Sequence, residues 1–183
     1  MRYFFYPFDD TAGLDLMDGL TASMTAPATL AHPAIGLIYR DDGTWQTTFS
    51  QVAITDSIFV VGHTASGQKV IASHADKAIR IDQTGIVERL IQCGLRSAVA
   101  CRIVIYACES ASGDTASLAA KVASSLLTNN FACSGNVYGF KGKVSTTPHK
   151  GSLCIEVNGG WVSVEDPDTE QLYYKHSAPY HHA

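Results

Sequence analysis

Two short runs of apolar residues without polar alternation stand out in the hydrophobic pattern of the chain. The first runs from Ser57 to His63, and the second runs from Cys101 to Cys108. Both consist largely of β-branched and aromatic residues, which is typical of central strands that are covered on both faces. If the two strands lie side by side and parallel, His63 and Cys108 emerge at the same carboxyl-end edge, where open α/β sheets carry their chemistry.

The pattern around these runs alternates between predicted strands and predicted helices. Apolar residues at helical spacing predict helices over 83–95 and over 114–127, the second with Asp114 as its N-cap, and a short helix over 14–24. The alternation predicts an α/β sandwich with a mainly parallel central sheet and hairpin additions. The remaining strands are expected at 2–8, 136–140, 152–157 and 161–164, and a turn at 158–160 is expected to join the last two. Two further hairpins are expected to pair 34–40 with 45–50 and 69–73 with 78–81.

Chain length and the position of the last patterned segment bound the domain organisation. With 183 residues, the chain is long enough for one domain with a substantial core. Residues 1–164 are expected to form this domain. From residue 165 onward the sequence is polar and aperiodic, so 165–183 is expected to be a mobile C-terminal tail.

Composition and charge exclude several classes of function. The formal net charge is −4, with 46% hydrophobic and 16% charged residues and no basic run, so a nucleic-acid surface is not expected. The longest apolar stretches have the length of strands, which predicts no membrane span. The first residues do not have the pattern of a signal peptide. A cytoplasmic protein is expected, or one that is secreted without a cleaved signal into a target cell.

The five cysteines do not form a disulfide framework or a zinc ribbon in this sequence. Their number is odd and no two have the CxxC spacing, so reduced thiols and no structural metal are expected. Cys93, Cys101 and Cys154 lie in apolar segments, where cysteine acts as a small core residue. Cys108 differs because a strand ends there and small polar residues come after it.

The residues around His63 and Cys108 resemble the caspase-like cysteine peptidases of clan CD. The match is V-V-G-H at residues 60–63 and I-Y-A-C at residues 105–108. The candidate histidine and cysteine are about 45 residues apart, close to the roughly 50 residues described for caspases. The next helix and the G-N-V-Y-G-F strand look most like clostripain-like enzymes and the self-cleaving protease domains of bacterial toxins. The resemblance covers about residues 57–140.

This resemblance implies a three-layer caspase-like fold and a thiol protease that hydrolyses peptide bonds. Cys108 would be the nucleophile and His63 its base, because a nearby imidazole promotes the thiolate. The backbone N–H groups of Cys108 and of Thr64, or else of Ser66, would hold the oxyanion. Protein or peptide is the implied substrate, with no cofactor, no metal and no third catalytic residue. The implied setting is a bacterial effector or toxin, or a self-processing protease.

The sequence also departs from the family pattern at the site. Thr64 comes directly after His63 where the family usually has glycine, and threonine resists a positive φ. Caspases carry Gln before Ala-Cys, whereas this chain has Tyr106 there, with Glu109-Ser110 after the cysteine. The resemblance is therefore to the broad group and not to caspases themselves.

Two alternatives from other classes remain open on the sequence. A catalytically inactive caspase-like domain that binds a partner protein is favoured by the missing glycine after His63. A small-molecule or metal site would use His63 and Cys108 as ligands, but metals need three or four and no spaced partners are present. His74 beside Asp76 is expected to be a surface residue. The 13 unclustered Lys and Arg residues argue against a polyphosphate activator.

Overall fold

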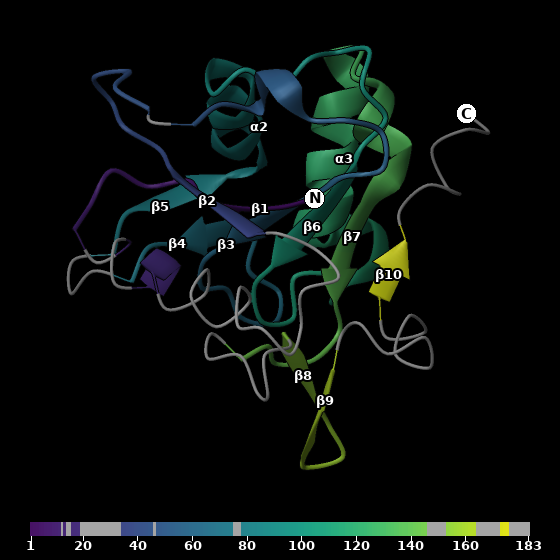
Figure 1. Ribbon diagram of the computed structural model, residues 1–183. Helices are drawn as coiled ribbons and strands as arrows, with labels where there is room; N and C mark the ends of the chain where they lie inside the picture. The colour runs from purple at the N-terminus through teal and green to yellow at the C-terminus, as the bar shows by residue number, and fades with distance from the viewer. Residues whose placement is uncertain are drawn as a thin grey trace.

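A six-stranded sheet forms the centre of the protein (Figure 1). The computed structural model describes residues 1–11, 13, 16–18, 34–45, 47–74, 78–145, 153–163 and 173–175. The sheet has the order β10-β7-β6-β3-β1-β2; β10 is antiparallel to β7, and the other five strands are parallel. The mainly parallel α/β sheet predicted from the sequence is confirmed. Its strands are β1 (Arg2–Tyr6), β2 (Ala34–Ile38), β3 (Ser57–Val61), β6 (Arg102–Tyr106), β7 (Val137–Phe140) and β10 (Tyr173–Lys175).

The central strands are apolar on both sides because both sides are covered. On β1, Tyr3 and Phe5 both pack edge-on against Phe49 of the short 3-10 helix η2 (Phe49–Gln51). Phe4 points to the opposite face, as alternation along a strand requires, and packs against Phe59 of β3. Continuous burial explains why the sequence shows no polar alternation in these runs.

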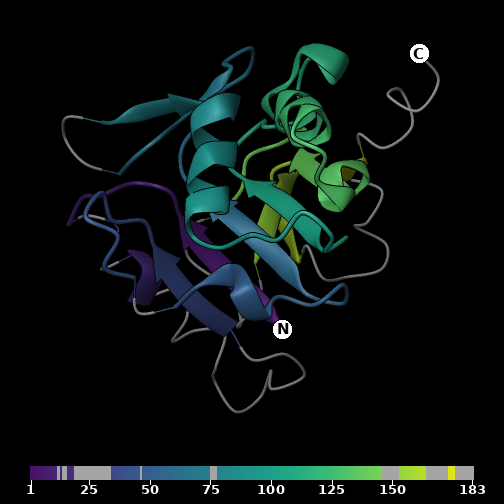
Figure 2. The same ribbon diagram turned by 90° about the horizontal axis from the view of Figure 1, so that it is seen from above.

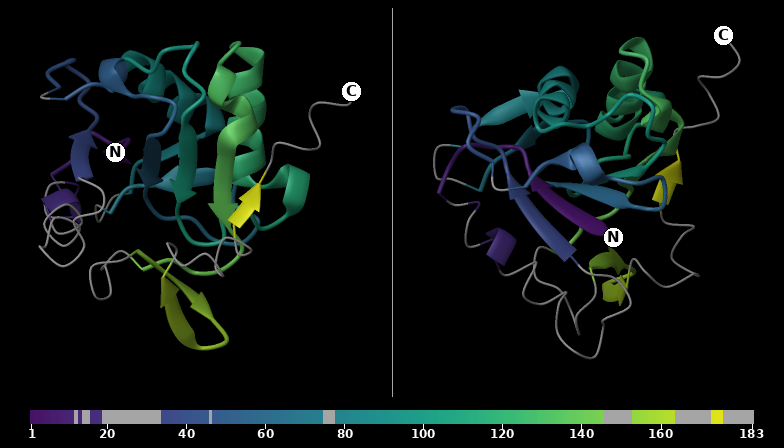
Figure 3. Two further views of the ribbon diagram at one scale, coloured as in Figure 1. Left: turned by 45° about the vertical axis from the view of Figure 1, so that its right-hand side comes forward. Right: turned by 45° about the horizontal axis from the view of Figure 1, so that its top comes forward.

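Helices α2 (Gln83–Gln92) and α3 (Leu118–Thr128) lie side by side on one face of the sheet (Figures 2 and 3). Both confirm helices predicted from apolar spacing. The Asp82 carboxylate caps α2 by accepting from two backbone N–H groups of its first turn. The predicted cap of the later helix is wrong: Ser117 caps α3, whereas Asp114 lies in the preceding 3-10 helix η3 (Asp114–Ala116). A further 3-10 helix, η4 (Ala132–Asn136), precedes β7.

Two small hairpins are added to the sheet, and a third expected one is absent. β4 (Val70–Ala72) pairs with β5 (Arg80–Asp82), and β8 (Cys154–Val157) pairs with β9 (Gly160–Ser163), as predicted. The hairpin expected over 34–50 is wrong. β2 is parallel to β1, and the expected partner segment contains the helix η2. The Asp42 turn is present, but Phe49 is drawn into the aromatic core instead of pairing with β2.

The face opposite the two helices is covered in part by β8. The Tyr106 hydroxyl on that face donates to the backbone carbonyl oxygens of Ser145 and Cys154, at 2.6 and 3.3 Å. The helix expected over 14–24 falls mostly outside the described residues, as does most of the tail from residue 165. Within that tail, β10 forms an edge strand on β7.

The described residues allow the predictions for the cysteines and for a membrane span to be compared with the structure. All five thiols are free, and Cys93, Cys101 and Cys154 are buried as predicted. Cys133, in η4, is buried beside Cys101; this contact and burial raise the pKa of the Cys133 thiol. No helix among the described residues combines the length and apolar character needed to cross a bilayer.

Candidate active site

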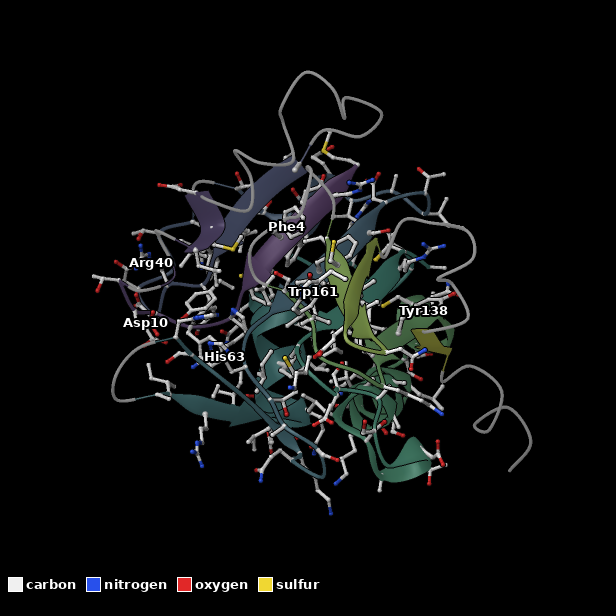
Figure 4. All side chains as sticks on the ribbon, turned by 90° about the horizontal axis from the view of Figure 1, so that it is seen from below. Phe4, Asp10, Arg40, His63, Tyr138 and Trp161 are labelled. Atoms are coloured by element: carbon white, nitrogen blue, oxygen red, sulfur yellow. The ribbon has the colours of Figure 1, made fainter. Side chains whose placement is uncertain are left out.

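The strand register brings His63 and Cys108 to one edge of the sheet. β3 and β6 are parallel neighbours, and their last residues, Val61 and Tyr106, are register partners. His63 and Cys108 each lie two positions beyond this pair. The sheet therefore brings both residues to its carboxyl-end edge, and Figure 4 labels His63 there.

The His63 end of this edge is also where the strand order reverses. From β1 the chain continues to β2 on one side, and it then returns to β3 on the other side of β1. In open α/β sheets such a switch point opens a crevice outside the carboxyl ends of the strands, where ligands bind. Tyr6 ends β1 at this point, and Asp10 lies just beyond it on the same side of the edge as His63 (Figure 4).

His63 is held by β4 and contacts His74. The backbone N–H of His63 donates to the Ala72 carbonyl at 2.9 Å, and the Ala72 N–H donates to the His63 carbonyl at 2.8 Å. Beyond this antiparallel bridge, His63 Nε2 and His74 Nδ1 are 2.7 Å apart and share a hydrogen bond. The two ring centroids are 3.7 Å apart. The side chain of His63 is solvent-exposed and that of His74 is half-buried.

His74 is not the surface residue expected from the sequence. Its backbone N–H donates to the Tyr6 hydroxyl at 2.9 Å, and this hydroxyl donates to the Asp10 carboxylate. Burial lowers the pKa of His74 to about 4; the nearby His63 adds to this shift and Asp10 opposes it. Partial desolvation of the exposed His63 ring, which lies against His74, also lowers the pKa of His63. Both rings are therefore neutral near pH 7, and one hydrogen lies between them.

A pH dependence of stability is expected from His74. Its folded-state pKa of about 4 lies below the ordinary value, so the unfolded chain binds more protons as the pH falls from about 6.5 to about 4. Stability is therefore lost over this interval, by about 1–2 kcal/mol after allowing for solvent around the half-buried ring. Urea unfolding at about pH 7 and about pH 4.5 should show this extra loss in wild type relative to His74→Asn. Equal losses would contradict the prediction.

Cys108 sits in a tight turn directly after β6. The Ser110 N–H donates to the Ala107 carbonyl at 3.3 Å, and Glu109 has a positive φ of 53°, which a non-glycine residue adopts rarely. The half-buried Cys108 Sγ faces the backbone of Val144. It accepts from the Val144 N–H at 3.4 Å and donates to the Val144 carbonyl oxygen at 3.7 Å.

Val144 presents its peptide groups to Cys108 because of its own pairing with β8. It forms an antiparallel bridge with Ile155, in which the flanking residues make the hydrogen bonds: Ser145 N–H to Cys154 O, and Glu156 N–H to Lys143 O. In such a non-hydrogen-bonded pair, the N–H and C=O of Val144 point away from β8. They point to the side on which the Cys108 thiol lies.

The Glu109 side chain joins the loop after Cys108 to the loop after His63. One of its carboxylate oxygens accepts from the Ser66 N–H at 2.6 Å. The Ser66 amide, the alternative oxyanion donor, is therefore already engaged. The Thr64 and Cys108 amides make no hydrogen bond with the described residues. Thr64 also avoids a positive φ, so it adopts this loop without the strain that glycine would relieve.

The Ser110 side chain anchors the turn after β6 to the sheet. Its buried hydroxyl donates to the Ile105 carbonyl at 2.8 Å and accepts from the Phe140 N–H at 3.0 Å, linking β6 to β7. Ser110→Ala removes both bonds and is expected to lower the free energy of unfolding by about 1–2 kcal/mol. Ser112→Ala, which removes one exposed bond, is the matched control and should change it by less than about 0.5 kcal/mol. Chemical denaturation of both variants measures the difference, and equal effects would contradict this role for Ser110.

The two candidate catalytic side chains do not hydrogen-bond to each other in this arrangement. His63 is paired with His74 and Cys108 with Val144. Sequence reasoning found both residues but missed Ser110, the Glu109–Ser66 contact and the His63–His74 pair. The sequence signals for these contacts were weak: polar residues in the loops after β3 and β6, and His74 shortly after the hairpin strand β4. Among the described residues, no group of three or more His, Cys, Asp or Glu side chains is arranged to hold a metal ion.

Comparisons with known proteins assign no family to this chain. No protein-family model matches it, and no curated protein matches it. The function of the site is therefore inferred from its own residues and their geometry.

Proposed function

We propose that the protein is a cysteine peptidase of the caspase-like group, with Cys108 as nucleophile and His63 as general base. The observation that carries this is the register of β3 and β6, which brings both residues to one sheet edge two positions beyond a paired Val61 and Tyr106. The parallel sheet and the resemblance around V-V-G-H and I-Y-A-C support the same class and its three-layer fold. Its substrate is a protein or peptide, and its setting is that of an effector, toxin or self-processing enzyme.

The reaction requires only groups that this edge supplies. The Cys108 thiol gives its proton to the His63 imidazole, and the sulfur attacks the scissile carbonyl carbon. The carbonyl electron pair moves to oxygen, and the amides of Cys108 and Thr64, which bond to none of the described residues, stabilise that oxyanion. The tetrahedral intermediate then expels the amine, which takes the proton from His63. A water molecule, deprotonated by His63, hydrolyses the thioester and restores the thiol.

One rearrangement precedes the attack on the substrate. The sulfur leaves its contacts with Val144, which are long at 3.4 and 3.7 Å and therefore weak. Catalytic hydrogen bonds are often long or misaligned in a free enzyme and tighten when the substrate binds. The attack therefore requires the Cys108 side chain to rotate out of these contacts with Val144.

A peptide-cleavage experiment tests the proposal. Purified wild type, Cys108→Ala and Cys93→Ala are incubated with a mixed peptide library, and the products are identified by mass spectrometry. Cleavage with one preferred residue before the cut, lost in Cys108→Ala and kept in Cys93→Ala, is expected. Cys93 is the matched control because it is a buried thiol at the end of α2. Absence of cleavage by wild type would count against the peptidase.

The second candidate function is an inactive caspase-like domain that binds a partner protein. It is favoured by the separate engagement of the two side chains, His63 with His74 and Cys108 with Val144. Thiol reactivity separates the two functions. Stoichiometric alkylation of Cys108 by iodoacetamide near pH 7, faster than that of the four buried thiols, supports the peptidase. An inert Cys108 together with intact library peptides supports the binding module.

A further inference from the structure

The backbone pairing of β4 with His63, which lies just beyond β3, positions His74 next to the His63 side chain. His63 lies opposite Ala72 in the antiparallel bridge to β4. In an antiparallel pair, the residue two positions beyond the partner lies diagonally across on the same face, within reach of long or aromatic side chains. His74 occupies that diagonal position, and its Nδ1 is 2.7 Å from His63 Nε2.

We propose that His74 is the positioning residue for His63. Its Nδ1 accepts a hydrogen bond from the Nε2–H of His63, which leaves the lone pair of the His63 ring on Nδ1. This inference rests on the proposed function, in which His63 takes the proton of Cys108. Nδ1 is the only ring nitrogen of His63 outside the contact with His74, so a base at this position works through it. The catalytic pair then becomes a chain of three residues, Cys108, His63 and His74.

His74 is itself held on several sides. Its backbone N–H is bonded to the Tyr6 hydroxyl, and the preceding Ser73 is tied to Ile79 by two hydrogen bonds across the base of the hairpin. The Tyr6 ring packs 6.2 Å from the His74 ring, and Tyr6 is fully buried. A ring fixed in this way can fix a second, solvent-exposed ring. Without His74, His63 at the sheet edge would be free to rotate and to change tautomer.

The surroundings of His74 keep it neutral, which is the charge state in which Nδ1 can accept a hydrogen bond. Among the described residues, the titratable groups that face it are His63, Tyr6 and Asp10; burial and a charged His63 both oppose its protonation. With a pKa of about 4, His74 stays neutral when His63 takes a proton from the thiol. His74 Nε2 has no hydrogen-bond partner among the described residues, so the bond at Nδ1 determines its tautomer. A neutral acceptor behind the base stabilises the imidazolium without adding a second charge.

Two variants of equal shape separate an acceptor from simple packing. Asn at position 74 places a carbonyl oxygen near the position of Nδ1, whereas Leu places a methyl group there. Ring ¹⁵N NMR shifts of His63 in wild type, His74→Asn and His74→Leu report its tautomer directly. Thermal unfolding shows whether each variant is folded. The values of kcat and KM for the peptide found in the library experiment give the catalytic effect.

The expected result is an Nε2–H tautomer of His63 in wild type and in His74→Asn, and a mixture of tautomers in His74→Leu. The kcat of folded His74→Leu should fall by as much as about 100-fold with little change in KM, and His74→Asn should recover most of it. An Nδ1–H tautomer in wild type, or identical His63 shifts in all three proteins, would overturn the inference. If no peptide is cleaved, the NMR result still decides it, so its failure and the failure of the proposed function are distinguishable.

Discussion

Peptide cleavage by His63→Ala is expected to be about 10³-fold slower in kcat/KM than cleavage by wild type. His63 both removes the thiol proton and protonates the leaving amine, and general acid–base catalysis of this kind contributes about 10²- to 10⁴-fold. The side chain is solvent-exposed at a sheet edge, so its removal leaves the core intact. Steady-state kinetics on the peptide identified in the library, with circular dichroism as a check of folding, measure the effect.

Added imidazole provides the control for this variant. Because truncation to alanine leaves space at an exposed position, free imidazole should restore part of the activity of His63→Ala. It should not restore Cys108→Ala, which lacks the nucleophile. Wild-type kcat/KM in His63→Ala would show that another group acts as the base, and the Cys108–His63 pair would have to be abandoned.

The fold could be predicted from the sequence wherever burial is continuous or periodic. The segments that form β3 and β6 are apolar on both faces, and the apolar residues of α2 have helical spacing. In each case the residue pattern alone indicates the type of element and how it is buried. The segment around Phe49 misled because a local turn signal at Asp41-Asp42-Gly43 indicates only a reversal of the chain. The conformation of the chain after that turn depends on the ring of Phe49, which packs on Tyr3 and Phe5 of β1.

The candidate site was predictable to the extent that it depends on strand ends. His63 and Cys108 could be placed together because parallel strands share one carboxyl-end edge. The His63–His74 pair could not be, because it depends on the register of β4 against the residue after β3. Likewise, the Glu109–Ser66 bond joins two loops whose separation is a tertiary property. Neither leaves a periodic signal in the sequence.

Gly62 is the residue on which this register depends most directly. A Cβ at this position would lie 2.6 and 2.7 Å from the Cγ1 and Cδ1 atoms of Ile71 and 3.0 Å from the Ala72 carbonyl oxygen. Ile71 is fully buried, and the Ala72 oxygen accepts the hydrogen bond from the His63 backbone. The absence of a side chain at Gly62 is therefore what lets β4 approach the end of β3 and bring His74 to His63.

Gly62→Ala is accordingly expected to lower the free energy of unfolding by about 3 kcal/mol, at the upper end of the range for overpacking. The added methyl must displace Ile71 and the β4 backbone together, so the His63–His74 contact should also be lost. Gly62→Ala should then show the same mixture of His63 tautomers that is expected for His74→Leu. Urea denaturation and ring ¹⁵N NMR measure the two effects.

Ile71→Ala supplies the control for this clash, because it removes both side-chain atoms that the new methyl would meet. Alone it is expected to destabilise by about 2–5 kcal/mol through the cavity it leaves. In the double variant the methyl at position 62 enters part of that cavity, so the combined loss should be smaller than the sum of the single losses by about 1 kcal/mol or more. Additive losses would mean that the Ala72 backbone, and not Ile71, sets the limit at this position. A Gly62→Ala protein as stable as wild type would contradict the close approach of β4 altogether.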